Sequence, residues 1–115
     1  MTRFLAAEAM LGAQPVVQLE DAVGGRRVCI ARLGAALLNF EVDEGGAWFD
    51  YADGYRDDME IVARAGSRFA IMAPFGGRIA DARYSFDGRA QDLQPGVEGD
   101  ARASRHGFVR GTTFD

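Results

Sequence analysis

The chain contains the run Arg83-Tyr84-Ser85-Phe86-Asp87-Gly88-Arg89-Ala90-Gln91-Asp92-Leu93, in which an Asp-Gly pair stands between two strand-like arms. Asp-Gly readily adopts the two positive φ angles of a type I′ turn, whose twist matches that of the strands it joins. The run therefore predicts a tight hairpin, with Tyr84 and Phe86 on one face because strand side chains alternate. Such a hairpin indicates an antiparallel, all-β fold.

Strand signals also dominate the residues before this hairpin. Short apolar runs rich in β-branched and aromatic residues alternate with Gly and Asp, a pattern typical of strands joined by tight turns. The pattern predicts strands at residues 16–19, 26–32 and 35–42. Residues 2–12 differ, and they read equally as a short helical turn or as a frayed terminus.

The other segments are expected to be loops, with one exception. Residues 48–58 interleave aromatic side chains with Asp, which predicts a surface loop packed down by its aromatics. Residues 94–103 are polar and contain Pro95, Gly96 and Gly99, which predicts a second loop. Residues 108–114 are strand-like in composition.

Composition and charge exclude several classes of protein. The chain has 115 residues, of which 48% are hydrophobic and 26% charged, as expected for one globular domain or a portion of one. Its net charge is −4 and its arginines are scattered, so no nucleic-acid partner is expected, because such binding needs clustered positive charge. No apolar run is long enough to span a membrane, and the N-terminus lacks the features of a signal peptide.

The single cysteine and the single histidine limit the cofactor chemistry. Cys29 lies in an apolar run and has no second cysteine to pair with, which favours a buried thiol in a reducing, cytoplasmic compartment. One His and one Cys offer no spacing for a transition-metal site, so we expect neither a metal nor a cofactor. Paired carboxylates can act as acid and base, but Asp53, Asp57 and Asp58 lie among Gly and Tyr, where turn and solubility roles are usual.

Two residues are candidates for chemistry. Arg78 follows Gly76-Gly77, where small residues allow a ligand or another backbone to approach closely. His106 is followed directly by Gly107. A guanidinium presents a fork of permanent donors, and an imidazole donates or accepts near neutrality. Taken singly, a lone Arg is more often a solvated charge and a lone His more often a loop residue bonded to backbone.

The order of these residues resembles the signature of the aldose 1-epimerase (galactose mutarotase) family. There an Asn-Arg-Ile run precedes a strand of the form Gly-x-Phe-x-x-Asp-Gly, and a His-Gly motif follows. This chain has Gly77-Arg78-Ile79, then Phe86-Asp87-Gly88, then His106-Gly107. An upstream run at 32–40 is similar to an early strand of the family. The resemblance covers about residues 26–115 and is strongest over 72–115.

The resemblance implies that residues 1–115 are the N-terminal portion of the family's antiparallel galactose mutarotase-like β-sandwich, or supersandwich, and are incomplete. It implies interconversion of the α and β anomers of an aldose by ring opening and reclosure, with a small-molecule sugar as partner. By this resemblance Arg78 binds sugar hydroxyls, and His106 is the catalytic and substrate-binding residue near the ring oxygen and C1. The family's second histidine and its glutamate base lie further downstream, so this chain alone is expected to be inactive.

Two departures from the family pattern leave the substrate open. Gly77 and Arg105 stand where the family usually has Asn. One alternative is a non-catalytic carbohydrate-binding or regulatory protein of the same fold. Another is a phosphosugar 1-epimerase, with Arg83, Arg105 and Arg110 as candidate phosphate ligands. An incomplete sandwich also leaves a sheet face and edge strands uncovered, so we expect self-association through that sheet.

Overall fold

The computed structural model describes residues 2–93 and 104–115 and is nearly all-β, with antiparallel sheets. The predicted fold class is therefore confirmed. The chain divides into two compact units: one comprises the residues up to Ile71 together with Arg110–Asp115, and the other comprises Met72–Val109. The loop predicted at 94–103 lies outside the described residues. No helix among the described residues is long and apolar enough to cross a membrane.

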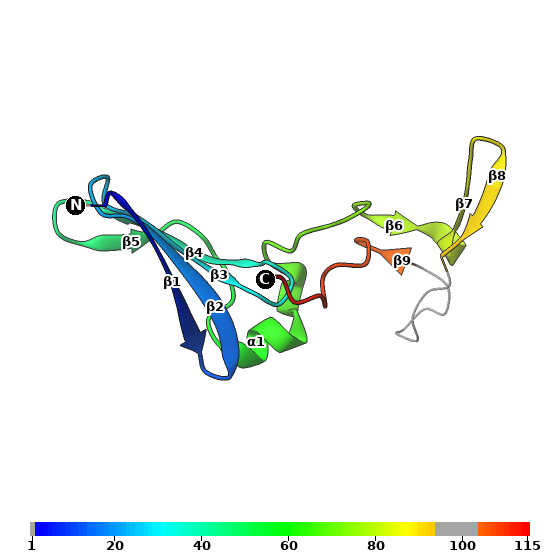
Figure 1. The fold of residues 1–115 in the computed structure, drawn as a ribbon. Coiled ribbons are helices and arrows are strands. Elements are labelled where there is room, and N and C mark those ends of the chain that lie inside the picture. Colours follow the sequence, from blue (N-terminus) through cyan, green and yellow to red (C-terminus); the bar gives the residue numbers. More distant parts are fainter. Residues whose placement is uncertain (1, 94–103) are drawn as a thin grey trace. The chain divides into compact units, whose positions relative to one another are not determined.

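The first unit is built on a five-stranded sheet with the order β1-β2-β3-β4-β5 (Figure 1). These strands are β1 (Phe4–Leu11), β2 (Gln14–Asp21), β3 (Arg26–Ala31), β4 (Leu37–Asp43) and β5 (Trp48–Asp50). The helix α1 (Asp58–Ala63) and the 3₁₀ turn η1 (Ala65–Ser67) follow. The C-terminal residues return to this unit, where Gly34 N–H donates to the Thr112 carbonyl at 2.7 Å.

The expectation of a helical turn or frayed end at residues 2–12 is wrong. Residues Phe4–Leu11 form an eight-residue strand that pairs antiparallel with β2 through a turn at Gly12-Ala13. Its Ala and Met residues favour helix locally, but Ala9 and Leu11 pack against the core and the ladder with β2 overrides that preference. Asp58 fixes the turn, because its carboxylate accepts the Ala13 N–H at 2.8 Å.

The loop expected at residues 48–58 is only partly right. Trp48–Asp50 forms the short strand β5 on β4. Of the aromatics expected to pack down, Tyr55 is in the core at 4% exposed, whereas Phe49 and Tyr51 are exposed. The helix α1 was not anticipated. Its N-cap is Asp57, which accepts the Glu60 N–H at 2.8 Å, and Ile61 anchors it in the core at 1% exposed.

The strand expected at residues 108–114 is also wrong. Phe108 N–H donates to the Ala73 carbonyl, whereas Phe114 N–H donates to the Arg32 carbonyl. The two ends of the segment thus bond to different parts of the chain, so no continuous ladder forms. Only an isolated bridge joins Thr113 to Leu33.

The two faces of the five-stranded sheet differ in character. On one face lie the buried side chains Val16 and Ala31, which pair directly across β2 and β3 and pack against Tyr55 and Ile61. On the other face an apolar row runs across four strands through Ala6, Leu19, Val28 and Phe40. Leu19 is 40% exposed and Phe40 36% exposed. This second face is an apolar surface that the described residues leave uncovered.

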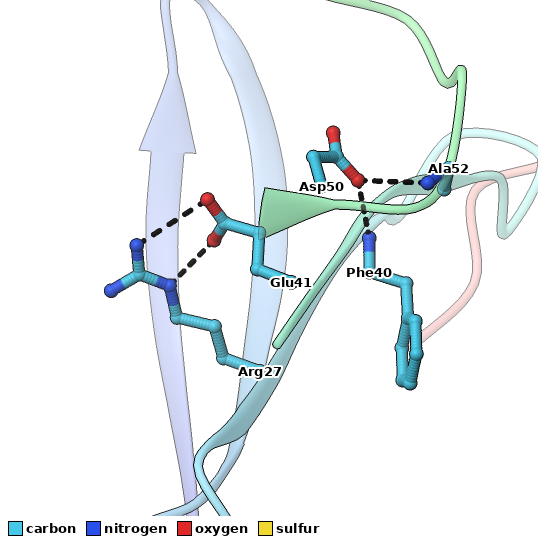
Figure 2. A network of polar contacts seen from close by, with 5 residues as sticks. All are labelled: Arg27, Phe40, Glu41, Asp50 and Ala52. Carbon is cyan, nitrogen blue, oxygen red and sulfur yellow. Dashed lines mark hydrogen bonds and ion pairs between the residues drawn. The ribbon is translucent and has the colours of Figure 1, made fainter. Parts of the chain in front are cut away.

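The core-bearing face becomes polar toward one end of the sheet. There Arg27 of β3 pairs with Glu41 of β4, with 2.5 Å between Nε and Oε2 (Figure 2). The Arg27 guanidinium also lies 4.1 Å from the ring centroid of Trp48. The Arg27 side chain therefore joins β3 to β4 through an ion pair and to the edge strand β5 through a cation–π contact.

The second unit contains two small antiparallel pairs. One pair is β6 (Arg78–Ile79) with β9 (Ser104–Arg105), and the other is β7 (Arg83–Phe86) with β8 (Arg89–Asp92). The 3₁₀ turn η2 (Ala80–Ala82) links β6 to β7. The predicted hairpin is confirmed, since Asp87 and Gly88 take φ values of 49° and 72° and the strands pair in register around them.

Candidate functional site

The structure brings the two sequence-predicted residues, Arg78 and His106, into one small element. Arg78 lies in β6 directly opposite Arg105 of β9, and His106 follows Arg105 in the chain. The two candidates are far apart in sequence, and the β6–β9 ladder makes them neighbours. Ser104, which pairs with Ile79, is 8% exposed and anchors this ladder.

Two hydrogen bonds lock His106 onto the residue that precedes Arg78. The His106 N–H donates to the Gly77 carbonyl at 2.8 Å, and the Gly77 N–H donates to His106 Nδ1 at 3.1 Å. Because Nδ1 must offer a lone pair to this donor, the proton of the neutral imidazole is on Nε2. His106 can therefore present an Nε2–H donor whose direction is fixed by the Gly77 backbone.

Gly77 itself has a left-handed backbone, with φ of 74°, and a Cβ at this position would meet nothing within 4 Å. Asn is among the side-chain-bearing residues that tolerate this conformation best. The backbone at Gly77 is therefore one that Asn, the usual residue of the family that the sequence resembles, can adopt, and it leaves room for the Cβ of an Asn.

Gly107 is required by close contact between two segments. A Cβ at Gly107 would lie 1.9 Å from the Ala73 carbonyl oxygen, and φ here is 72°. The adjacent Phe108 N–H donates to that same carbonyl at 2.8 Å, and its ring meets Phe75 edge-on at 5.6 Å between centroids. The glycine after His106 therefore lets the chain pass against Ala73 and so fixes where the imidazole lies.

His106 has a φ of 62°, an uncommon conformation for a residue with a side chain. Such a backbone costs on the order of 1 kcal/mol or more, and it persists only where surrounding contacts hold it. The Gly77 and Ala73 hydrogen bonds supply these contacts. No sequence signal pointed to the role of Ala73, because the contact joins residues that are distant along the chain.

The charges beside His106 are positive. Arg78 and Arg105 are exposed and lie directly opposite each other, and neither forms an ion pair within residues 2–93 or 104–115. Two facing cations disfavour their own strand pairing. Their free forks of donors are suited to a ligand rich in oxygen acceptors.

The other sequence candidates have structural partners. Arg83 pairs with Asp92, with 3.1 Å between Nε and Oδ2. Arg110 donates to the Ser67 hydroxyl at 2.8 Å and belongs to the first unit. The loop carboxylates are also engaged, since Asp57 caps α1 and Asp58 holds the β1–β2 turn.

Metal-ligating side chains do not gather in the described parts of the chain, where no group of three or more His, Cys, Asp or Glu residues could hold an ion. The candidate site thus consists of guanidinium, imidazole and backbone groups. These can orient and polarise an oxygen-rich ligand.

Comparisons with known proteins bear on the family and the fold of the chain. The family model described as aldose 1-epimerase matches residues 15–115. The crystal structure of galactose 1-epimerase from Lactobacillus acidophilus NCFM superposes with a TM-score of 0.64 at 14% sequence identity. The match covers 92% of this chain and 30% of that one, so this chain spans about a third of its structural relative. A search of curated protein sequences finds no significant match.

Proposed function

Because the chain belongs to the aldose 1-epimerase family, we propose that it forms part of an enzyme that interconverts the α and β anomers of an aldose in carbohydrate metabolism. The observation that carries the proposal is the β6–β9 ladder, which sets His106 beside Arg78 and fixes its imidazole through Gly77. A cytoplasmic location is part of the proposal, since the one cysteine is a free thiol.

In this proposal Arg78 and His106 position the sugar. The Arg78 guanidinium donates to neighbouring hydroxyls and holds the ring in place. The Nε2–H of His106 donates to a sugar oxygen near the ring oxygen and C1, and so stabilises negative charge that develops there as the ring opens. Both groups act as donors, which agrees with the tautomer that the Gly77 N–H imposes.

Ring opening also needs an acid for the ring oxygen and a base for the anomeric hydroxyl. His106 is the single histidine of the 115 residues, and its Nδ1 is already an acceptor for Gly77. We therefore assign the proton-transferring pair to polypeptide beyond this chain, and we expect the chain alone to lack turnover.

Polarimetry of freshly dissolved α-D-galactose tests the proposal. The longer polypeptide that contains this chain should accelerate mutarotation, and Arg78→Met or His106→Leu should reduce kcat/KM by about 100-fold, as expected when a transition-state donor is removed. The 115-residue chain should match the buffer rate. Gln91→Met, an exposed change on β8, is the control. Unchanged activity in the His106→Leu enzyme would remove the site assignment.

One observation favours a phosphosugar as the substrate. Of the three arginines considered as phosphate ligands, only Arg105 lies beside the candidate site, directly opposite Arg78. Two facing guanidiniums match the charge and geometry of a phosphate. If the substrate is a phosphosugar, Arg105→Gln should lower kcat/KM for a hexose 6-phosphate at least tenfold while leaving the value for galactose unchanged.

A further inference from the structure

The first unit contains a cavity that the proposed mutarotase chemistry does not use. Its volume is about 400 Å³, within the range of small-molecule sites. The cavity lies on the core-bearing face of the five-stranded sheet and is bounded on one side by the segment from Ala52 to Arg56. All its lining residues come from the first unit, so the cavity exists independently of the β6–β9 ladder.

The position of the cavity follows from the order of side chains across the sheet. Gln18, Cys29 and Asn39 pair in register across β2, β3 and β4, and they form one row on this face. The next row toward α1 is apolar, and the next row toward the turn end carries Arg27 and Glu41. The row of two amides about a thiol thus marks the boundary between the core and the charged end of the sheet, where the cavity opens.

A carboxylate at the rim is preorganised. One oxygen of Asp50, Oδ1, accepts both the Phe40 N–H at 3.0 Å and the Ala52 N–H at 2.9 Å (Figure 2). These two backbone bonds hold the side chain in one orientation and leave Oδ2 to accept from a ligand. Asp50 lines the cavity together with Asp53 and Arg56.

The lining selects one class of ligand. Asp53 is paired with Arg68, with 3.5 Å between Oδ1 and Nη1. The charges of Asp50 and Arg56 balance, so the lining offers an anion no net attraction. The amides and the carboxylate make the walls too polar for an apolar molecule, since such a guest would leave them unpaired. A neutral molecule with several neighbouring hydroxyls fits, because each hydroxyl can donate to a carboxylate or amide oxygen and accept from an amide N–H.

We propose that this cavity is a second binding site, for a neutral polyhydroxy compound, in which Gln18, Asn39 and Asp50 pair with neighbouring hydroxyls above the Cys29 thiol. Recognition here requires hydroxyl groups and no anomeric carbon. This separates the site from the mutarotase chemistry, which needs a hemiacetal.

The probe is therefore myo-inositol, which has a ring of hydroxyls and no anomeric centre. Cys29 is the single cysteine and lines the cavity, so its alkylation by iodoacetamide reports on occupancy. Burial and the nearby Glu41 charge raise the pKa of this thiol, so the reaction is followed by mass spectrometry at mildly alkaline pH. If the dissociation constant is about 10 mM, roughly 100 mM myo-inositol should slow alkylation about tenfold by mass action.

The variant Gln18→Met tests the row directly, and it keeps the fold because this side chain is exposed. It should lose most of the protection, as should Asn39→Leu, whereas Gln91→Met should retain it. Amide resonances of the Gln18 and Asn39 side chains should shift on titration in the unmodified chain. The proposal is overturned if myo-inositol leaves the alkylation rate unchanged, if betaine at the same concentration protects equally, or if Gln18→Met remains fully protected.

Discussion

The substitution Gly107→Ala tests how the candidate site is held together. A methyl group at this position would stand 1.9 Å from the Ala73 carbonyl oxygen, and a contact of at least 3.0 Å is needed, so the two segments must separate by about 1.1 Å. The Phe108 N–H bond to the same oxygen, now 2.8 Å, would not survive such a shift. Since His106 precedes this glycine, its bonds with Gly77 should be lost as well.

Three contributions add up to the stability that the second unit is expected to lose in Gly107→Ala. Ala in a left-handed backbone costs about 1 kcal/mol. The broken Phe108 hydrogen bond costs about another 1 kcal/mol, and overpacking against a backbone atom costs about 1–3 kcal/mol. The sum is roughly 3–5 kcal/mol. Gly88→Ala is the matched control, because its φ is also 72° and a Cβ there would meet nothing within 4 Å, so only the backbone contribution of about 1 kcal/mol applies.

Native-state hydrogen exchange of the His106 and Phe108 amides is the suitable assay. The single tryptophan, Trp48, lies in the first unit, so its fluorescence does not report on the second. In Gly107→Ala both amides should exchange at close to the rate of an unstructured chain. In Gly88→Ala they should remain protected almost as well as in the unmodified chain. Equal exchange in the two variants, or a still-protected Phe108 amide in Gly107→Ala, would refute the steric reasoning.

Four further predictions concern the rest of the chain. Gly54→Ala should lower the free energy of unfolding of the first unit by about 2–4 kcal/mol, because its Cβ would lie 2.1 Å from the Leu38 carbonyl oxygen. Urea titrations followed by tryptophan fluorescence measure this loss, and a loss below about 0.5 kcal/mol would contradict the prediction. Asp21→Asn should destabilise the unit most above about pH 4, and the penalty should shrink steadily as the pH falls below that value. The Arg3 guanidinium and the Gly24 N–H hold the pKa of Asp21 well below its usual range, so its contribution is full above the unfolded-state pKa and is lost as the pH falls through the folded-state pKa. A penalty independent of pH would argue against that ion pair. Gly77→Asn should leave amide exchange in the second unit unchanged, since φ is 74° and the space is open, and should strengthen sugar binding measured by calorimetry in the longer polypeptide. Finally, the 115-residue chain should self-associate in light scattering through its uncovered sheet face, and Leu19→Lys should shift it toward monomer; a monomer at all concentrations would refute this proposal.

Local turn chemistry explains which elements were predictable. The hairpin at Asp87-Gly88 could be predicted because its two positive φ angles depend on the identities of the two residues themselves. The strands β2, β3 and β4 were located to within a few residues from the alternation of apolar runs and turns. The helix α1 also had a local signal, since Asp57 and Glu60 stand at capping-box spacing, but the surrounding aromatics favoured a loop.

The segments for which the sequence-based prediction is wrong have structures set by distant hydrogen-bond partners. Residues 4–11 carry a composition compatible with helix, and they form β1 because β2 offers a ladder and the core accepts Ala9 and Leu11. Residues 108–114 have a composition compatible with a strand, and they form none because their ends bond to Ala73 and Arg32. In both cases the backbone hydrogen bonds available in the folded chain outweigh the preference of the segment.

The candidate site, too, was predictable from the sequence only in part. By itself, the sequence determined that Arg78 and His106-Gly107 occur in the order found in the aldose 1-epimerase family, and that the chain is all-β. Only the tertiary structure decided that the two residues are neighbours, that the Gly77 N–H occupies Nδ1 of His106, and that Gly107 passes against Ala73. The physical reason is the separation along the chain of the residues that interact. Turn and strand preferences arise between residues a few positions apart, whereas the tautomer of an imidazole and the space for a Cβ are set by backbone atoms that only folding brings close.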